Sequence, residues 1–197
     1  MNKERFQKQL DFILEVDKEK NIFRQSHLSG YIRHENDAEH AWHIALMVYL
    51  LKEYANDEFD LAKAMIMALI HDIVEIDAGD TYAYDMQALK TQKEREERAA
   101  NRIFGLLPDD QKELLIALFN EFEKGETPEA RFARTMDNLQ PLLLNDINNG
   151  KDWRLHDVNK SKVINRQKTS SLGSEEIWEF TKKLIDKNVK KGNIKDE

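Results

Sequence analysis

The sequence predicts an all-α fold, a bundle of about six to seven helices. Glycine and proline, which a chain needs for frequent tight turns, occur only seven and three times among 197 residues. That is too few for the many turns of a β-sandwich or a β-barrel. Apolar residues instead recur at intervals of three and four along most of the chain, which is the period of a helix. We predict no strand.

Length and composition limit what the chain can be. We expect one domain, residues 1–197, with its core over roughly residues 5–150. Cysteine is absent, so any metal ion must be held by histidine and carboxylate. A net charge of −7 disfavours a nucleic-acid polymer as partner. No apolar run has the roughly 18 residues of a membrane span, and the first twenty residues lack the apolar stretch of a signal peptide, so we expect a cytoplasmic protein that does not contact membranes.

The first three helices follow from apolar spacing and from signals at helix ends. They cover residues 3–18, 36–54 and about 60–76. Asn36 and Glu39 resemble a capping box at the start of the second helix. Gly79 and the short polar residues around it end the third helix and predict a loop.

Four further helices follow, at residues 86–105, 108–124, 128–147 and 174–190. Pro108 and Pro128 occupy first-turn positions, where a missing N–H costs nothing. Thr127 and Ser174 are residues of the N-cap type. The lysine-rich tail after the last helix is expected to be frayed.

Polar side chains lie on the apolar faces of three of these helices. His40 shares a face with Ile44, while His71 and Asp72 continue the apolar face of the third helix and Asp137 lies among apolar residues of the sixth. A lone inward histidine or aspartate is usually an ordinary hydrogen-bonded core residue. Two imidazoles and two carboxylates converging from three helices instead indicate a site for one divalent ion, with Mn, Co, Fe, Ni, Zn and Mg as candidates.

The order and spacing of these residues resemble the HD-domain metal-dependent phosphohydrolases, in particular the branch of the 5′-deoxynucleotidases. The resemblance covers roughly residues 5–150 and rests on the segments Asp37-Ala38-Glu39-His40, His71-Asp72-Ile73-Val74-Glu75-Ile76, Gly79-Asp80, Thr127-Pro128-Glu129-Ala130 and Met136-Asp137-Asn138-Leu139. It implies the HD-domain helical bundle as the fold. It also implies that the ligands of the metal ion are His40, His71, Asp72 and Asp137.

The resemblance implies catalytic and substrate-binding residues as well. Glu75, which we expect at the C-terminal end of the same helix as His71, is the acid/base or water-orienting group. Asp80 orients water, protonates the leaving sugar oxygen or contacts the sugar. Arg24 matches an arginine that meets the substrate phosphate, and Arg33 is a second candidate. The alternatives are that Glu75 is an exposed carboxylate at a helix end, that Asp80 is a polar turn residue and that Arg33 is an ordinary surface arginine.

One departure from the family pattern concerns the sugar. Relatives commonly carry a tryptophan shortly after the phosphate-contacting arginine, near the place of a 2′-hydroxyl, whereas Gln25, Ser26 and His27 follow here. The choice between ribose and deoxyribose is therefore open, and His27 is either a replacement wall of the pocket or a surface residue, which we favour. Surface or boundary positions are also expected for His34, His43 and His156.

The expected reaction is hydrolysis of nucleoside 5′-monophosphates, above all deoxyribonucleotides, to nucleoside and phosphate. Alternatives are an HD phosphohydrolase acting on another phosphate ester, a cyclic nucleotide or an alarmone, and a non-catalytic nucleotide-binding module.

Two features concern assembly and helix shape. Apolar residues exceed one face of the helices at residues 109–123 and 131–147, which, with the homodimers of relatives, predicts a homodimer that uses this surplus. Pro141 cannot donate to the backbone carbonyl of Asp137 and predicts a bend that aims Asp137 at the ion, or else a helix break.

Overall fold

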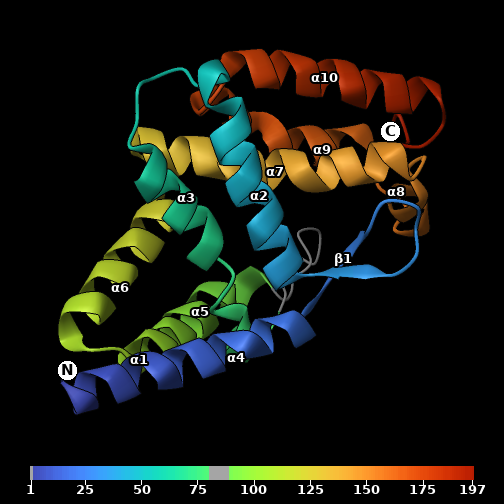
Figure 1. Cartoon of the computed structure of the whole chain (residues 1–197). Helices are drawn as coiled ribbons and strands as arrows, with labels where there is room; N and C mark the ends of the chain where they lie inside the picture. Colours follow the sequence, from blue (N-terminus) through green and yellow to red (C-terminus); the bar gives the residue numbers. More distant parts are fainter. Residues whose placement is uncertain (1, 80–88) are drawn as a thin grey trace.

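The computed structural model describes residues 2–79 and 89–197 (Figure 1). Its helices and strands, in chain order, are α1 (Lys3–Val16), β1 (Phe23–His27), β2 (His34–Asn36), α2 (Asp37–Leu51), α3 (Leu61–Ile70), α4 (Glu75–Ala78), α5 (Leu89–Ile103), α6 (Asp109–Lys124), α7 (Pro128–Ile147), α8 (Lys151–Leu155), α9 (Lys160–Gln167) and α10 (Glu175–Lys190).

The predicted helical bundle is confirmed. The seven expected helices correspond to α1, α2, α3, α5, α6, α7 and α10, and the short helices α4, α8 and α9 raise the number above the six to seven predicted. Asn36 and Glu39 form the expected capping box, since the Asn36 side chain accepts from the Glu39 N–H at 2.9 Å and Glu39 accepts from the Asn36 N–H at 3.2 Å. Thr127 and Ser174 cap α7 and α10.

The prediction that the chain contains no strand is wrong. β1 and β2 pair antiparallel in a hairpin, but five and three residues are too short for alternation to stand out in the sequence. Asn148, just past α7, holds the hairpin loop: its side chain accepts from the Gly30 N–H at 3.1 Å and donates to the Leu28 carbonyl at 3.0 Å. These bonds fix β1 beside the C-terminal end of α7.

The C-terminal tail is not frayed as expected. Asn193 and Ile194 are buried, and the backbone of Lys195 bonds to both Val158 and Lys160, at 3.1 and 2.8 Å. The tail therefore closes over the segment between α8 and α9.

The core consists of two apolar clusters with α3 between them. α2, α3 and α7 pack on one another, and in Figure 1 α2 crosses the centre of the molecule with α10 on one side and α1 on the other. The first cluster, between α2, α7 and α10, includes Ile44, Val48, Phe132, Met136 and Ile185. The second, between α3, α5 and α6, includes Met67, Ile103, Phe104, Phe119 and Phe122. α3 contributes to both, so the residues that follow it lie at the junction.

The apolar surplus of α7 is used inside the chain. Leu142 and Leu144 are buried, because α7 contacts α2, α3, α6 and α9 on different sides. Because they are buried within the chain, Leu142 and Leu144 are not available for the dimer interface that the sequence predicted. The helix also runs through Pro141 to Ile147, so it does not break there.

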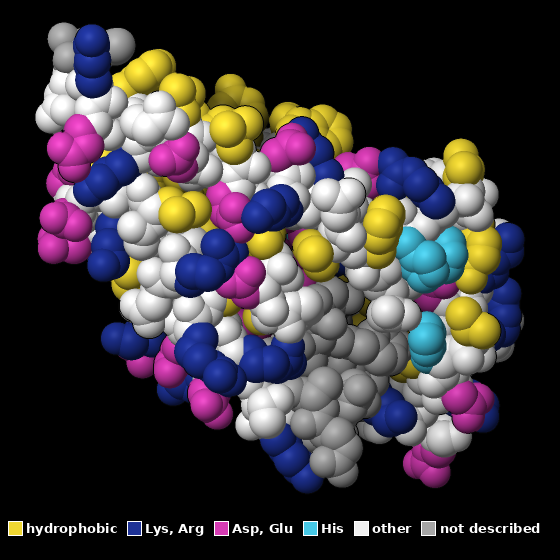
Figure 2. Space-filling model, turned by 90° about the horizontal axis from the view of Figure 1, so that it is seen from below, with side chains coloured by type: hydrophobic (Ala, Val, Ile, Leu, Met, Phe, Trp, Pro, Cys, Tyr) yellow, Lys and Arg dark blue, Asp and Glu magenta, His cyan; other side chains and the backbone are white. Residues whose placement is uncertain are grey.

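The described surface carries mixed charge. On the face shown in Figure 2, Lys and Arg side chains are interspersed with Asp and Glu, so no continuous basic patch is seen on the described part of this face. Among the described helices, none combines the length and the apolar character that crossing a bilayer requires.

Gly173 provides a test of the packing on α7. A Cβ added there would lie 2.4 Å from the Arg131 carbonyl oxygen and from Thr135 Oγ1, both on α7. We expect Gly173→Ala to cost about 1–3 kcal/mol and to lower the melting temperature by several degrees, measured by thermal denaturation. Gly105→Ala is the matched control, because a Cβ there meets nothing within 4 Å. Equal melting temperatures for the two variants would contradict this packing.

Candidate metal centre

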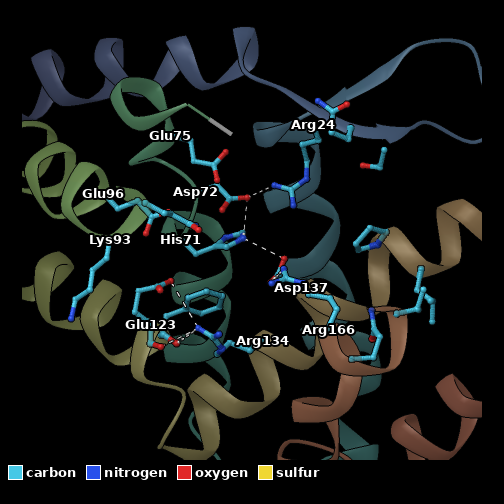
Figure 3. Close-up of a pocket in the computed structure, with 18 of the residues that line it drawn as sticks. Arg24, His71, Asp72, Glu75, Lys93, Glu96, Glu123, Arg134, Asp137 and Arg166 are labelled. Atoms are coloured by element: carbon cyan, nitrogen blue, oxygen red, sulfur yellow. Dashed lines mark hydrogen bonds and ion pairs between the residues drawn. The ribbon is translucent and has the colours of Figure 1, made fainter. Parts of the chain in front are cut away.

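The four ligands predicted from the sequence lie together at the junction of α2, α3 and α7. His40 Nε2 is 3.1 Å from Asp137 Oδ1, and His71 Nε2 is 3.0 Å from Asp72 Oδ2 and 3.7 Å from Asp137 Oδ1. One atom each of His40, His71 and Asp72 fall within 4.8 Å of one another. These three residues are buried and Asp137 is half-buried. Figure 3 shows His71, Asp72 and Asp137 directed towards one another.

A tight turn after α3 positions the His-Asp pair. α3 ends at Ile70, and the next residues form turns with bonds from the Ile73 N–H to Ile70 and from the Glu75 N–H to the Asp72 carbonyl, at 3.3 and 2.8 Å. The expectation that Glu75 shares a helix with His71 is therefore wrong, since Glu75 begins α4. Over four residues the apolar pattern of such turns cannot be distinguished from that of an α-helix.

The ring of His71 is oriented by its own helix. Its Nδ1 lies 3.0 Å from the Ala68 carbonyl oxygen, which can only accept, so Nδ1 carries the hydrogen. Nε2 then offers a lone pair to the cluster when the ring is neutral.

The ring of His40 is oriented by two residues that the sequence analysis missed, Gln140 and Glu35. His40 Nδ1 donates to Gln140 Oε1 at 3.0 Å. The Gln140 amide in turn donates to Glu35 Oε1 at 2.6 Å and to His43 Nδ1 at 3.2 Å. Because both amide hydrogens have acceptors, Oε1 must face His40, and Nε2 of His40 is left for the cluster. The position of Gln140, three residues after Asp137 on one helix, was a usable signal.

The chemistry of this cluster fits a divalent metal ion. With neutral rings, the Nε2 lone pairs of the two imidazoles face carboxylate oxygens of Asp72 and Asp137 at 3.0–3.7 Å, an arrangement that a shared cation stabilises. Burial and the charge of Arg24 lower the pKa of His40 to about 4. Burial also disfavours charge on His71, but Asp72 and Asp137 outweigh it and raise its pKa to about 10. Two nitrogens and two carboxylates suit the borderline divalent metals.

Arg24 reaches the cluster from β1. Its Nη1 lies 2.5 Å from Asp72 Oδ2 and 3.2 Å from Asp37 Oδ1. Burial opposes ionisation of Asp72, but His71 and Arg24 outweigh it and hold its pKa well below the usual value. The structure thus brings Arg24 to the predicted site, where carboxylates already surround it.

The other sequence-predicted residues lie elsewhere or outside the described residues. Arg33 is exposed and pairs with Glu39 at 2.5 Å, away from the cluster. Asp80 lies outside the described residues. The expectation of a surface position for His27 is wrong, because its Nδ1 lies 2.8 Å from Asp152 and its ring stacks on Tyr31. His34 packs against the ring of His27. His43 is half-buried, as expected for a boundary residue.

A cavity of about 940 Å³ lies over the cluster. His71, Asp72, Glu75 and Asp137 line it, together with residues of β1, α5, α6, α8 and α9. Glu75 is buried, with 7% of its surface exposed. Figure 3 places Glu75 beside Asp72 on one side of the cluster and Arg166 beside Asp137 on the other. The arrangement joins a candidate metal site to a space large enough for a small molecule.

Known proteins with similar sequences and structures agree with this site. The model of the HD domain family matches residues 16–178. A crystal structure from Magnetospirillum magnetotacticum, described as a predicted metal-dependent phosphohydrolase, is 45% identical, with a TM-score of 0.93 and coverage of 96% of this chain and 95% of that one. An HD-domain phosphohydrolase from Listeria innocua, 18% identical with a TM-score of 0.57, shares the fold.

Curated relatives are named 5′-deoxynucleotidase HDDC2. The human protein is 30% identical over 111 residues, which are 56% of this chain and 53% of the relative, and the mouse protein is 29% identical over 127 residues, or 62% of each. The chain thus spans about half to two thirds of the length of these relatives. The predicted HD-domain helical fold and the predicted hydrolase family are confirmed by the family match and the Magnetospirillum structure. The chain belongs to the HD-domain family.

Proposed function

We propose that the chain is a metal-dependent phosphomonoesterase that hydrolyses nucleoside 5′-monophosphates, deoxyribonucleotides above all, to nucleoside and phosphate. The names of the curated relatives support this substrate class. The observation that carries the proposal is the cluster of His40, His71, Asp72 and Asp137, of which the last three line the cavity.

His40, His71, Asp72 and Asp137 would hold the ion. When bound, a divalent ion supplies Lewis acidity and lowers the pKa of water at the site. Glu75, which lines the cavity beside Asp72, would orient the attacking water and accept its proton on a carboxylate oxygen. Arg24 would donate to the phosphate, since Asp37 and Asp72 position its guanidinium on the cavity wall. We keep Asp80 as the proposed partner of the leaving 5′-oxygen.

We also propose a homodimer that uses a surface of α2 and α3 in place of the buried apolar residues of α7. α2 exposes four large apolar side chains at helical spacing, and α3, which packs on α2, exposes two more. These residues are Trp42, Leu46, Tyr49, Leu50, Ile66 and Leu69. A second copy of the chain can present the same apolar surface across a twofold axis.

The dimer proposal is tested by size-exclusion chromatography with light scattering. Leu46→Glu places a charge in this surface, so we expect the mass to fall from that of two chains to that of one. Phe180→Glu, at an exposed apolar residue of α10, is the control and should leave the mass unchanged. A monomeric wild-type protein contradicts the proposal.

Substrate class is tested with a panel of ribo- and deoxyribonucleoside 5′-monophosphates, with Mn²⁺, Co²⁺ or Mg²⁺ added separately to metal-free protein. We expect phosphate release that requires metal. Turnover of cyclic nucleotides or other esters alone would favour the second enzymatic candidate. Thermal stabilisation by nucleotides without turnover under any metal would favour a binding module.

Asp72→Asn and Glu75→Gln should separate metal binding from chemistry. Asp72→Asn removes a ligand, so both bound metal and activity should be lost. Glu75→Gln should retain about one ion per chain while kcat falls about 10²- to 10⁴-fold. Metal content by mass spectrometry and phosphate release by a colorimetric assay give the two readouts. Full activity in Glu75→Gln would disprove the role of Glu75.

A further inference from the structure

The charge of Arg24 is largely balanced before a substrate arrives. Its Nη1 is shared between Asp72 and the fully buried Asp37, and only 14% of its side chain is exposed. A phosphate monoester brings two negative charges into a cavity lined by Asp72, Asp137 and Glu75. One guanidinium neutralised by two carboxylates offsets little of that repulsion, so a further cation at the cluster would favour binding.

Arg166, on α9, is placed to supply that charge. Its Nη2 lies 3.5 Å from Asp137 Oδ2, whereas the two histidines contact the other oxygen, Oδ1. The side chain lines the cavity and is 43% exposed. A guanidinium has five N–H donors in a planar fork that matches two phosphate oxygens. Among the described residues, the ion pair of Arg166 is the one with Asp137, and at this length it leaves most of these donors available.

Arg134 and Lys93, which also line the cavity, are less suited to this role. Arg134 donates to the carbonyls of Phe122 and Glu123 at 3.0 and 3.1 Å, where it caps the C-terminal end of α6. Lys93 is 90% exposed and its Nζ lies 3.9 Å from Glu97. Figure 3 shows Arg24 and Arg166 reaching the cluster from different elements, Arg24 beside Asp72 and Arg166 beside Asp137.

We propose that Arg166 is a second phosphate-binding residue of the site, which together with Arg24 selects dianionic phosphate monoesters over monoanionic diesters. This inference rests on the proposed function for its substrate class. Arg166 donates to the non-bridging phosphate oxygens and takes no part in proton transfer. A monoester offers three such oxygens and two charges, and a diester two oxygens and one charge, so the second guanidinium favours the monoester.

The test compares Arg166→Gln with Lys162→Gln in the full-length protein. Lys162 lies one turn earlier on α9, is exposed and does not line the cavity, so its replacement removes the same charge elsewhere on the helix. Inorganic phosphate is the probe, and its dissociation constant is measured by calorimetry on protein saturated with Mn²⁺ or Co²⁺. Metal affinity is measured separately, without phosphate.

We expect Arg166→Gln to weaken phosphate binding about 10- to 100-fold, the effect of losing charge-assisted hydrogen bonds. Lys162→Gln should change it by no more than about twofold, because an exposed charge away from the cavity is screened. Metal affinity should change by no more than about fivefold in either variant, since partly exposed ion pairs contribute little. Arg166→Lys should recover part of the phosphate affinity, because it restores charge without the planar fork.

Three results would overturn the inference. Unchanged phosphate affinity in Arg166→Gln, with altered metal affinity, would mean that Arg166 only positions Asp137. Equal losses in Arg166→Gln and Lys162→Gln would mean that net charge alone matters. Wild-type protein that holds metal but binds no phosphate would also overturn it.

Failure of the proposed function would look different. A wild-type protein that binds phosphate through Arg166 yet hydrolyses no nucleoside monophosphate would refute that function and leave the phosphate-binding role of Arg166 standing.

Discussion

The structure depends on one electrostatic constraint: two histidine nitrogens and two carboxylates face one another between three packed helices. Nε2 of His40 lies 3.1 Å from Asp137, and Nε2 of His71 lies 3.0 Å from Asp72 and 3.7 Å from Asp137, with the side chains largely buried. Such an arrangement is unfavourable without a positive charge at its centre. The packing of α2, α3 and α7 brings these donors together, so the geometry of the site depends on the packing of the bundle.

Residues outside the cluster determine what it can bind. The Ala68 carbonyl and the Gln140 side chain take up the Nδ1 hydrogens of the two rings, so each ring directs Nε2 to the same place. Arg24 and Arg166 approach the two carboxylates from β1 and α9. These cations hold the ligands ionised and give the adjoining cavity a preference for anions.

The sequence was informative where long helices carry the site. His40 and Asp137 lie on α2 and α7, whose apolar period reveals inward polar residues. It was uninformative where position depends on tertiary contacts. The hairpin of β1 and β2 is held by Asn148, and the turn that separates Glu75 from α3 is too short to carry a period. Arg166 lies outside the motif segments that carry the sequence resemblance, which cover roughly residues 5–150, so its place against Asp137 reveals it.

The most direct measurement is anomalous diffraction from crystals of metal-free protein soaked in Mn²⁺ or Co²⁺. We predict one strong anomalous peak per chain, with His40 Nε2, His71 Nε2 and oxygens of Asp72 and Asp137 at about 2.0–2.2 Å from it. No peak at this position under saturating metal, or a peak that excludes both histidines, would contradict the role of this cluster.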